Sequence, residues 1–424
     1  GKVSTGRSGR WAEFVRRQAG WRNPVVILSA VAGIAWAGSS VMAPLLPLFA
    51  ESLHARPLGL GLAISAYAFA GMFGSLLAGA LGSRWPIMLF LAGGLVVEGF
   101  SNLLIAGVGT LAGLVGLRAL AGLGAGATLV GTRAYIARTT EPDRLAFVNG
   151  TVSAAESGGQ ALGPVLGGIV ATLSNLRLPF VVVAITSALA ASVSLRLPRQ
   201  RQAGRNPQVN AAPAETVLPK SKLTLLLVAQ FLVLAAYGGV FTIYPLFAVQ
   251  QMGWSVLAVG LLVSAFGCGA ILVGPRLARL ADLTSRAAVG TCCLWAVALW
   301  LALTLGLAPR AVIFALGFAA GGAFAAYNGA WYALLTASVP PAMQTKVLAV
   351  VLAVSQLGVV AGATASSAAW QVWGIVVGLM VVVAAPLMAS AAMAVLWRTG
   401  GKPAAGGPGK HAGEVTINLQ VESS

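Results

Sequence analysis

Long apolar stretches alternate with short polar breaks over most of the chain. Apolar runs of twenty or more residues recur throughout, and each is long enough to cross a bilayer as a helix. The strands of an outer-membrane barrel would instead give ten-residue segments of alternating polarity, which we do not find. The pattern predicts an all-α membrane protein with twelve transmembrane helices. We expect these spans at about 24–50, 58–82, 86–107, 109–137, 144–172, 177–197, 222–250, 255–280, 287–307, 310–338, 343–371 and 373–398.

The polar segments divide the chain into two halves. Residues 198–221 are rich in Pro, Gln and Asn and predict a flexible linker between a six-helix half at 24–197 and a second at 222–398. Residues 1–23 form a basic lead-in, either a short amphipathic helix on the membrane surface or a disordered tail, and 399–424 form a polar tail. No small-residue cleavage site follows a short apolar core, so we expect no removable signal peptide.

The two halves repeat each other. The segment Pro47-Leu-Phe-Ala50 recurs 198 residues further on, and Ser65, Gly122, Gly159 and Gly163 each recur at an offset of 199. A constant offset implies two pseudo-symmetric copies of one six-helix unit. In proteins built this way, a transported molecule binds between the repeats, near the middle of the bilayer.

Composition and charge agree with this interpretation. The chain is 58% hydrophobic and only 9% charged, which excludes a soluble globular domain. Its net charge of +17 does not predict nucleic-acid binding, because the basic residues sort by loop. All but four of the 27 lysines and arginines, Arg133 included, fall on the side of the N-terminus; Arg56, Arg177 and Arg310 lie on the other side, and Arg118 lies mid-span. We therefore expect both termini in the cytoplasm and the lipid bilayer as the main partner.

The sequence offers little for catalysis. With two histidines and ten acids, no Ser-His-Asp set, phosphate loop or metal cluster can be assembled. We expect no enzyme activity, no cofactor, no metal site and a monomeric protein, and the lack of a phosphate loop excludes an ATP-driven pump within this chain.

One stretch combines regularly spaced glycines with an acid inside an apolar span. Glu156 shares a helix face with three of the glycines, and glycines at four-residue spacing let another helix approach closely. The proline in the stretch removes a helical hydrogen bond and predicts a kink. Ordinary helix packing is the simpler interpretation of such glycines. The fixed positions are Gly150, Gly159, Gly163, Pro164, Gly167 and Gly168.

This stretch and the two six-span halves resemble the major facilitator superfamily. The spacing matches, at every fixed position, the antiporter signature that is typical of its drug:proton antiporter branch. Arg118-Ala-Leu-Ala-Gly122 looks like the RxxxG motif of the family, whose arginine is associated with proton coupling. The resemblance implies proton-coupled export of small hydrophobic or amphipathic compounds across a cytoplasmic (inner) membrane by alternating access. A lipid or lysolipid translocator, or a non-transporting sensor or scaffold, are the alternatives on the same fold.

The family's loop motif between spans two and three, GxLaDRxGRR, is incomplete. Here it reads Gly79-Ala-Leu81-Gly-Ser83-Arg84, with Ser83 in place of the acid. At the equivalent place in the second half stand Asp282 and Arg286. We hypothesise that the conformational latch usually provided by this loop has moved to the second half.

Three ionisable residues lie deep in the predicted spans: Glu98, Glu156 and Arg118. An isolated charge at the centre of a bilayer costs several kcal/mol, so such residues pair, become protonated or face water. We predict Glu156 as the proton carrier with Arg118 as its partner, and a permanently paired structural acid is the alternative. Glu98 is the weaker candidate, because the third span usually lies at the periphery in this family.

The candidate substrate-binding residues combine aromatic rings with a few amide and hydroxyl groups. Such surfaces suit an amphipathic organic molecule, although aromatic residues also serve simply as packing. These residues are Trp36, Ser39 and Ser40 in the first span, Gln230, Tyr237 and Tyr244 in the seventh, and Tyr327, Asn328, Trp331 and Tyr332 in the tenth.

Overall fold

The computed structural model describes residues 23–82, 84–140, 144–198, 220–337 and 341–399. Over these ranges the chain forms helices and no strands, which confirms the predicted all-α class. Ser83 and nearly all of the basic lead-in, the linker and the polar tail lie outside the described residues, so the expectations for them stay predictions.

The helices follow the expected order in both halves. The first half contains α2 (Pro24–Val41), α3 (Leu46–Ser52), α4 (Pro57–Leu81), α5 (Ile87–Gly107), α6 (Leu111–Thr139), α7 (Leu145–Leu173) and α8 (Leu178–Ser194). The second half contains α9 (Lys220–Gln250), α10 (Val256–Leu272), α11 (Gly274–Leu283), α12 (Arg286–Leu303), α13 (Arg310–Ala337), α14 (Pro341–Trp373) and α15 (Ile375–Thr399).

Two predicted spans are broken helices. The first divides into α2 and α3 around Pro44, and the eighth bends by 42° between α10 and α11, where Gly274 and Pro275 interrupt the apolar run. Among the described residues, nine helices are long and apolar enough to cross a membrane, or ten if α10 and α11 form one span. The more polar α7 and the shorter α8 occupy the two remaining positions of the predicted twelve.

The glycines of α7 bring that helix against α2. A Cβ atom built on Gly163 would lie only 2.5 Å from the carbonyl oxygen of Ala37, and Gly159 and Gly167 meet α2 equally closely. Real Cβ atoms do not approach other atoms within 3.0 Å, so only glycine permits this contact. The close helix approach predicted for these three glycines is thus confirmed.

The second half repeats this packing. A Cβ built on Gly362 of α14 would lie 1.9 Å from the carbonyl oxygen of Ala235 in α9. Gly362 follows Gly163 by 199 residues and Ala235 follows Ala37 by 198, the two offsets found in the sequence. The repeat in the sequence therefore corresponds to a repeat of helix contacts.

The halves meet through two antiparallel helix pairs, α4 with α14 and α7 with α10. Ser65 Oγ donates to the carbonyl of Val360 at 3.3 Å in the first pair, and in the second the amide of Val165 donates to Ser264 Oγ at 3.2 Å. Gly168, the last glycine of the stretch in α7, meets the backbone of Leu257 in α10.

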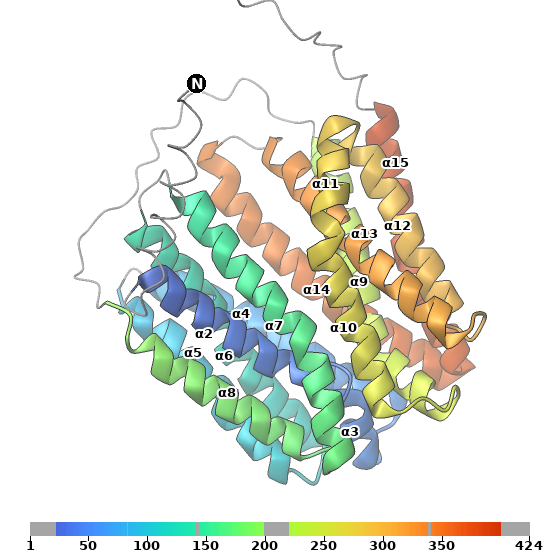
Figure 1. Cartoon of the computed structure of the whole chain (residues 1–424), viewed down its shortest axis with the longest axis horizontal. Coiled ribbons are helices and arrows are strands. Elements are labelled where there is room, and N and C mark those ends of the chain that lie inside the picture. The colour runs from blue at the N-terminus through green and yellow to red at the C-terminus, as the bar shows by residue number, and fades with distance from the viewer. Residues whose placement is uncertain (1–22, 83, 141–143, 199–219, 338–340, 400–424) are drawn as a thin grey trace, which may run out of the picture.

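These contacts lie toward one end of the molecule. We call the end where α8 stops and α9 begins the linker end, and the opposite one the far end. At the far end the Gln250 amide donates to the carboxylate of Glu51, which joins α9 to α3. In Figure 1 the ribbons of α7 and α10 approach each other toward the far end, at the bottom of the view, and diverge toward the linker end.

Candidate functional site

The deepest acid of the first half is Glu98 on α5. Its side chain is 4% exposed and belongs to the buried stripe of that helix, together with Leu91, Leu95, Asn102 and Ile105. These positions recur every three or four residues, as one face of a helix requires. The third span is therefore not peripheral at this position, because the stripe turns Glu98 into the helix bundle.

Four helices contribute to the surroundings of Glu98. Ser39 of α2 donates a 2.7 Å hydrogen bond to its Oε1, and the hydroxyl of Tyr67 on α4 lies 3.4 Å from the same oxygen. The guanidinium carbon of Arg118 on α6 lies 4.2 Å from the centre of the Tyr67 ring. We call Ser39, Tyr67, Glu98 and Arg118 the Glu98 cluster.

Arg118 is held in this cluster by a ring rather than by a carboxylate. A cation over an aromatic face is attracted by the negative face of the ring. Among the described residues Arg118 forms no ion pair within 4.0 Å, and its Nε atom is buried without a hydrogen-bond partner. The arginine therefore keeps a donor available for the carboxylate of Glu98 or for a bound molecule.

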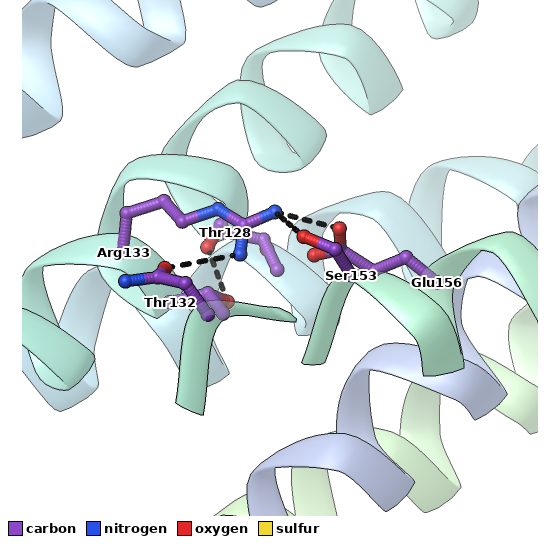
Figure 2. Close-up of polar contacts among 6 residues, drawn as sticks. Thr128, Thr132, Arg133, Ser153 and Glu156 are labelled. Carbon is purple, nitrogen blue, oxygen red and sulfur yellow. Dashed lines mark hydrogen bonds and ion pairs between the residues drawn. The ribbon is translucent and has the colours of Figure 1, made fainter. Parts of the chain in front are cut away.

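Glu156 pairs with a different arginine from the one predicted. Its Oε2 lies 2.6 Å from a terminal nitrogen of Arg133, whose guanidinium also reaches Ser153 and Asn149 at 3.5 Å. Figure 2 shows the Arg133 side chain extending from α6 toward Ser153 and Glu156 on α7. The predicted pairing of Glu156 with Arg118 is therefore wrong, and Arg133 is a helix residue rather than the loop residue we assigned.

The two acids thus have different electrostatic surroundings. An opposite charge at 2.6 Å keeps a carboxylate ionised. Glu98 accepts hydrogen bonds from hydroxyl groups, and its nearest cation is engaged with an aromatic ring. Of the two, Glu98 is the better placed to change its protonation, while Glu156 matches the alternative of a structurally paired acid.

Three of the candidate substrate residues form part of the packed core of the second half. Trp331 and Tyr327 are fully buried, and Gln230 is 4% exposed. The Trp331 indole donates to the carbonyl of Leu226 at 2.8 Å, and the Tyr327 hydroxyl lies 3.4 Å from the Gln230 amide oxygen. In this conformation these side chains hold α9 against α13 instead of lining an open wall, because each already uses its polar atom internally.

The remaining candidates lie closer to accessible space. Trp36, Ser40 and Asn328 are partly exposed, and Tyr237 and Tyr332 are about 40% exposed. Tyr244 is buried, but its ring lines a cavity in the second half. The prediction from sequence included Ser39 and Arg118 of the Glu98 cluster and gave Glu98 a secondary place, but it missed Tyr67.

The two loop-motif positions also differ in their surroundings. Gly79 has open space around it, whereas Asp282 accepts a 2.9 Å hydrogen bond from Arg286 Nε across the junction of α11 and α12. Both partners of this ion pair are exposed to more than a third. The pair joins neighbouring elements of one half, so a latch role remains a prediction.

Comparison with known proteins identifies the family. The family model of the Major Facilitator Superfamily matches residues 28–282 and 226–420. Multidrug resistance protein MdtG of Escherichia coli is 26% identical over 274 residues, which cover 62% of this chain and 67% of MdtG. An uncharacterised MFS-type transporter of Methanocaldococcus jannaschii is 27% identical over 157 residues. That alignment covers 37% of this chain and 41% of the archaeal protein.

Solved structures show the same fold. The nucleoside transporter NupG, as its D323A mutant, superposes with a TM-score of 0.73 at 15% identity, covering 88% of this chain and all of NupG. A bacterial homologue of the human lysosomal transporter Spinster, inward-facing and occupied, gives a TM-score of 0.68 at 15% identity, with 88% and 96% covered. The matches of the family model, the paired six-helix halves and these shared folds lead to one conclusion: the chain is a multi-pass membrane protein of the Major Facilitator Superfamily.

Proposed function

We propose that this chain is a proton-coupled antiporter that exports small amphipathic organic compounds across a cytoplasmic membrane by alternating access. The single observation that carries the proposal is the Glu98 cluster. A buried carboxylate that accepts hydrogen bonds only from hydroxyl groups, next to an arginine on an aromatic ring, can bind and release a proton. The family of transporters and the 26% identity to a multidrug resistance protein support a small organic substrate rather than enzyme chemistry.

In this proposal Glu98 carries the proton and Arg118 answers its change of charge. When Glu98 is protonated, Arg118 rests on the Tyr67 ring, as observed. When Glu98 loses its proton, the free Nε–H of Arg118 becomes a donor for the carboxylate. Because Ser39 lies on α2 and Tyr67 on α4, this exchange connects protonation to the position of two helices, one of which meets the other half.

Transport in proteoliposomes tests the proposal. With the vesicle interior acidified, ethidium uptake and proton exit are recorded together, the latter with an internal pH-sensitive dye. We expect the wild type to exchange ethidium for protons and Glu98→Gln to lose this coupling. Glu156→Gln is the matched control, because it removes the same charge at a carboxylate that is paired with Arg133, and proton exit should still accompany uptake.

Two results would overturn this assignment. Intact coupling in Glu98→Gln together with lost coupling in Glu156→Gln would make Glu156 the carrier, as the sequence alone suggested. Redistribution of a fluorescent lipid without any proton flux would instead favour the lipid translocator.

A further inference from the structure

The four residues of the Glu98 cluster have counterparts in the second half. The offset of 198 residues relates Ser39 to Tyr237, and the offset of 199 relates Tyr67 to Phe266, Glu98 to Val297 and Arg118 to Gly317. The helix packing keeps the same register: Gly122 meets the carbonyl of Tyr67, and Gly321 meets that of Phe266. Every polar group of the cluster except one hydroxyl is thus replaced by an apolar side chain or by none.

This second position contains a cavity. It measures about 80 Å³ and lies among α9, α10, α12, α13 and α15. Three of the four counterparts, Tyr237, Phe266 and Val297, line it, and Trp300 adds a further ring. Pockets that enclose drug-sized ligands measure about 300–1,000 Å³, so this cavity has room for one ring or one branched alkyl group. Its walls expose almost no polar surface.

One polar group in the wall has no partner. The Tyr244 hydroxyl is buried and makes no hydrogen bond within the part of the chain that the structure describes. Such a group loses its bonds to water without replacement, which costs free energy in the empty protein. A bound ring that carries an oxygen or nitrogen atom would supply the missing partner.

The cavity approaches the Glu98 cluster on the side of Tyr237. Tyr237 is 39% exposed, whereas Val259, Leu262 and Val297 in the wall are buried. The Tyr237 hydroxyl also lies within electrostatic range of the Tyr67 hydroxyl in the other half. One molecule between the halves could therefore contact the polar cluster at one end and the cavity at the other.

We propose that the cavity bounded by Tyr237, Tyr244, Phe266, Val297 and Trp300 binds the single apolar ring of the transported molecule, while the polar end of that molecule faces the Glu98 cluster. The ring carries a hydrogen-bonding substituent that pairs with the Tyr244 hydroxyl. This inference rests on the proposed transport function, and it restricts the substrate class to compounds with one ring of limited size and a separate polar end.

Competition against ethidium transport tests the size of the site in the wild-type protein. The probes are tetramethylammonium, benzyltrimethylammonium and naphthylmethyltrimethylammonium, which share one cationic group. Burial of a ring stabilises binding enough for benzyltrimethylammonium to compete about ten- to a hundredfold better than tetramethylammonium. The second ring of the naphthyl compound should add nothing, because the cavity is full. A steady gain with each ring, or no gain at all, would contradict the proposal.

Substitution of the wall locates the site. Val240→Phe fills the cavity from α9, and we expect it to reduce the benzyl advantage to less than about threefold. Val228→Phe is the matched control, since Val228 lies on the same helix but is 43% exposed and outside the cavity. If Val240→Phe keeps the full advantage, the cavity is only a packing void.

A milder variant covers the case in which Val240→Phe does not fold. Tyr244→Phe retains the ring and removes only the unpartnered hydroxyl. In the wild type, 4-methoxybenzyltrimethylammonium should compete about three- to tenfold better than the benzyl compound, and Tyr244→Phe should abolish this difference. An unchanged ratio would refute the role of Tyr244. Loss of proton-driven ethidium transport in the wild type would instead refute the proposed function, so the two failures are distinguishable.

Discussion

The contact between α7 and α2 allows a prediction whose size follows from the geometry. In Gly163→Ala the new Cβ would lie 2.5 Å from the Ala37 carbonyl oxygen and 2.6 Å from Ser40 Cβ. Both distances are below the 3.0 Å that real Cβ atoms observe, so α2 and α7 must move apart. Overpacking of this kind costs about 1–3 kcal/mol. Alanine returns up to about 1 kcal/mol through its higher helix propensity.

Gly150 provides the matched control within the same helix and the same sequence stretch. A Cβ on Gly150 meets nothing within 4 Å, so Gly150→Ala should gain the helix propensity without the clash. The difference in unfolding free energy between the two variants should thus be about 1–3 kcal/mol, with Gly163→Ala the less stable. Gly362→Ala should resemble Gly163→Ala, because its Cβ would lie 1.9 Å from Ala235.

Reversible unfolding of the purified protein in mixed micelles, followed by circular dichroism, gives these free energies. Transport provides a second measure: displacement of α2 carries Ser39 away from Glu98, so Gly163→Ala should also transport more slowly than Gly150→Ala. Equal stability of the two variants would refute the reasoning, because it would mean that the helices are not held at glycine contact distance.

Three further predictions concern the charged and aromatic residues. Arg133→Met leaves the carboxylate of Glu156 without its partner and should destabilise the protein by about 1–3 kcal/mol, less than for a fully buried pair since Arg133 is partly exposed; the double variant with Glu156→Gln should regain most of this in a thermal unfolding cycle. Asp282→Asn should impair ethidium transport more than Ser83→Ala and change stability by less than about 1 kcal/mol, since its ion pair is exposed; equal activity of the two variants would refute the latch hypothesis. Tyr67→Phe keeps the ring below Arg118 and removes the hydroxyl near Glu98, so it should slow proton-coupled uptake less than Tyr67→Leu, which removes both contacts.

The span positions could be predicted because they depend on local properties. The length of each apolar run and the constant offset between the halves are independent of how the helices rotate. The breaks within two spans were missed, although Pro44 and the pair Gly274 and Pro275 mark them in the sequence. A hydrophobicity count averages over such residues, since a single proline changes the mean little and the backbone greatly.

The pairing of charges could not be predicted from depth alone. We compared the heights of Glu156 and Arg118 along the membrane normal, but the helix face also decides which side chains meet. Arg133 lies one to two turns from the end of α6, where sorting by loops counts it as a surface charge. A long arginine side chain can bridge from there to Glu156, because its stem packs along apolar surface while its head finds the carboxylate. Glu98, in contrast, could have been found from the period of the α5 stripe.

The comparison of the two halves gives a physical reason for their unequal chemistry. Their glycine contacts are the same, so each half can move as a packed unit whatever its other side chains are. The ionisable groups of the Glu98 cluster occur in the first half only, where a change of protonation alters the local charge. Val297 and Gly317, at the matching positions, cannot respond to pH. A proton can therefore act on one half and an apolar ring on the other, and the two compete only where Tyr67 and Tyr237 meet between the halves.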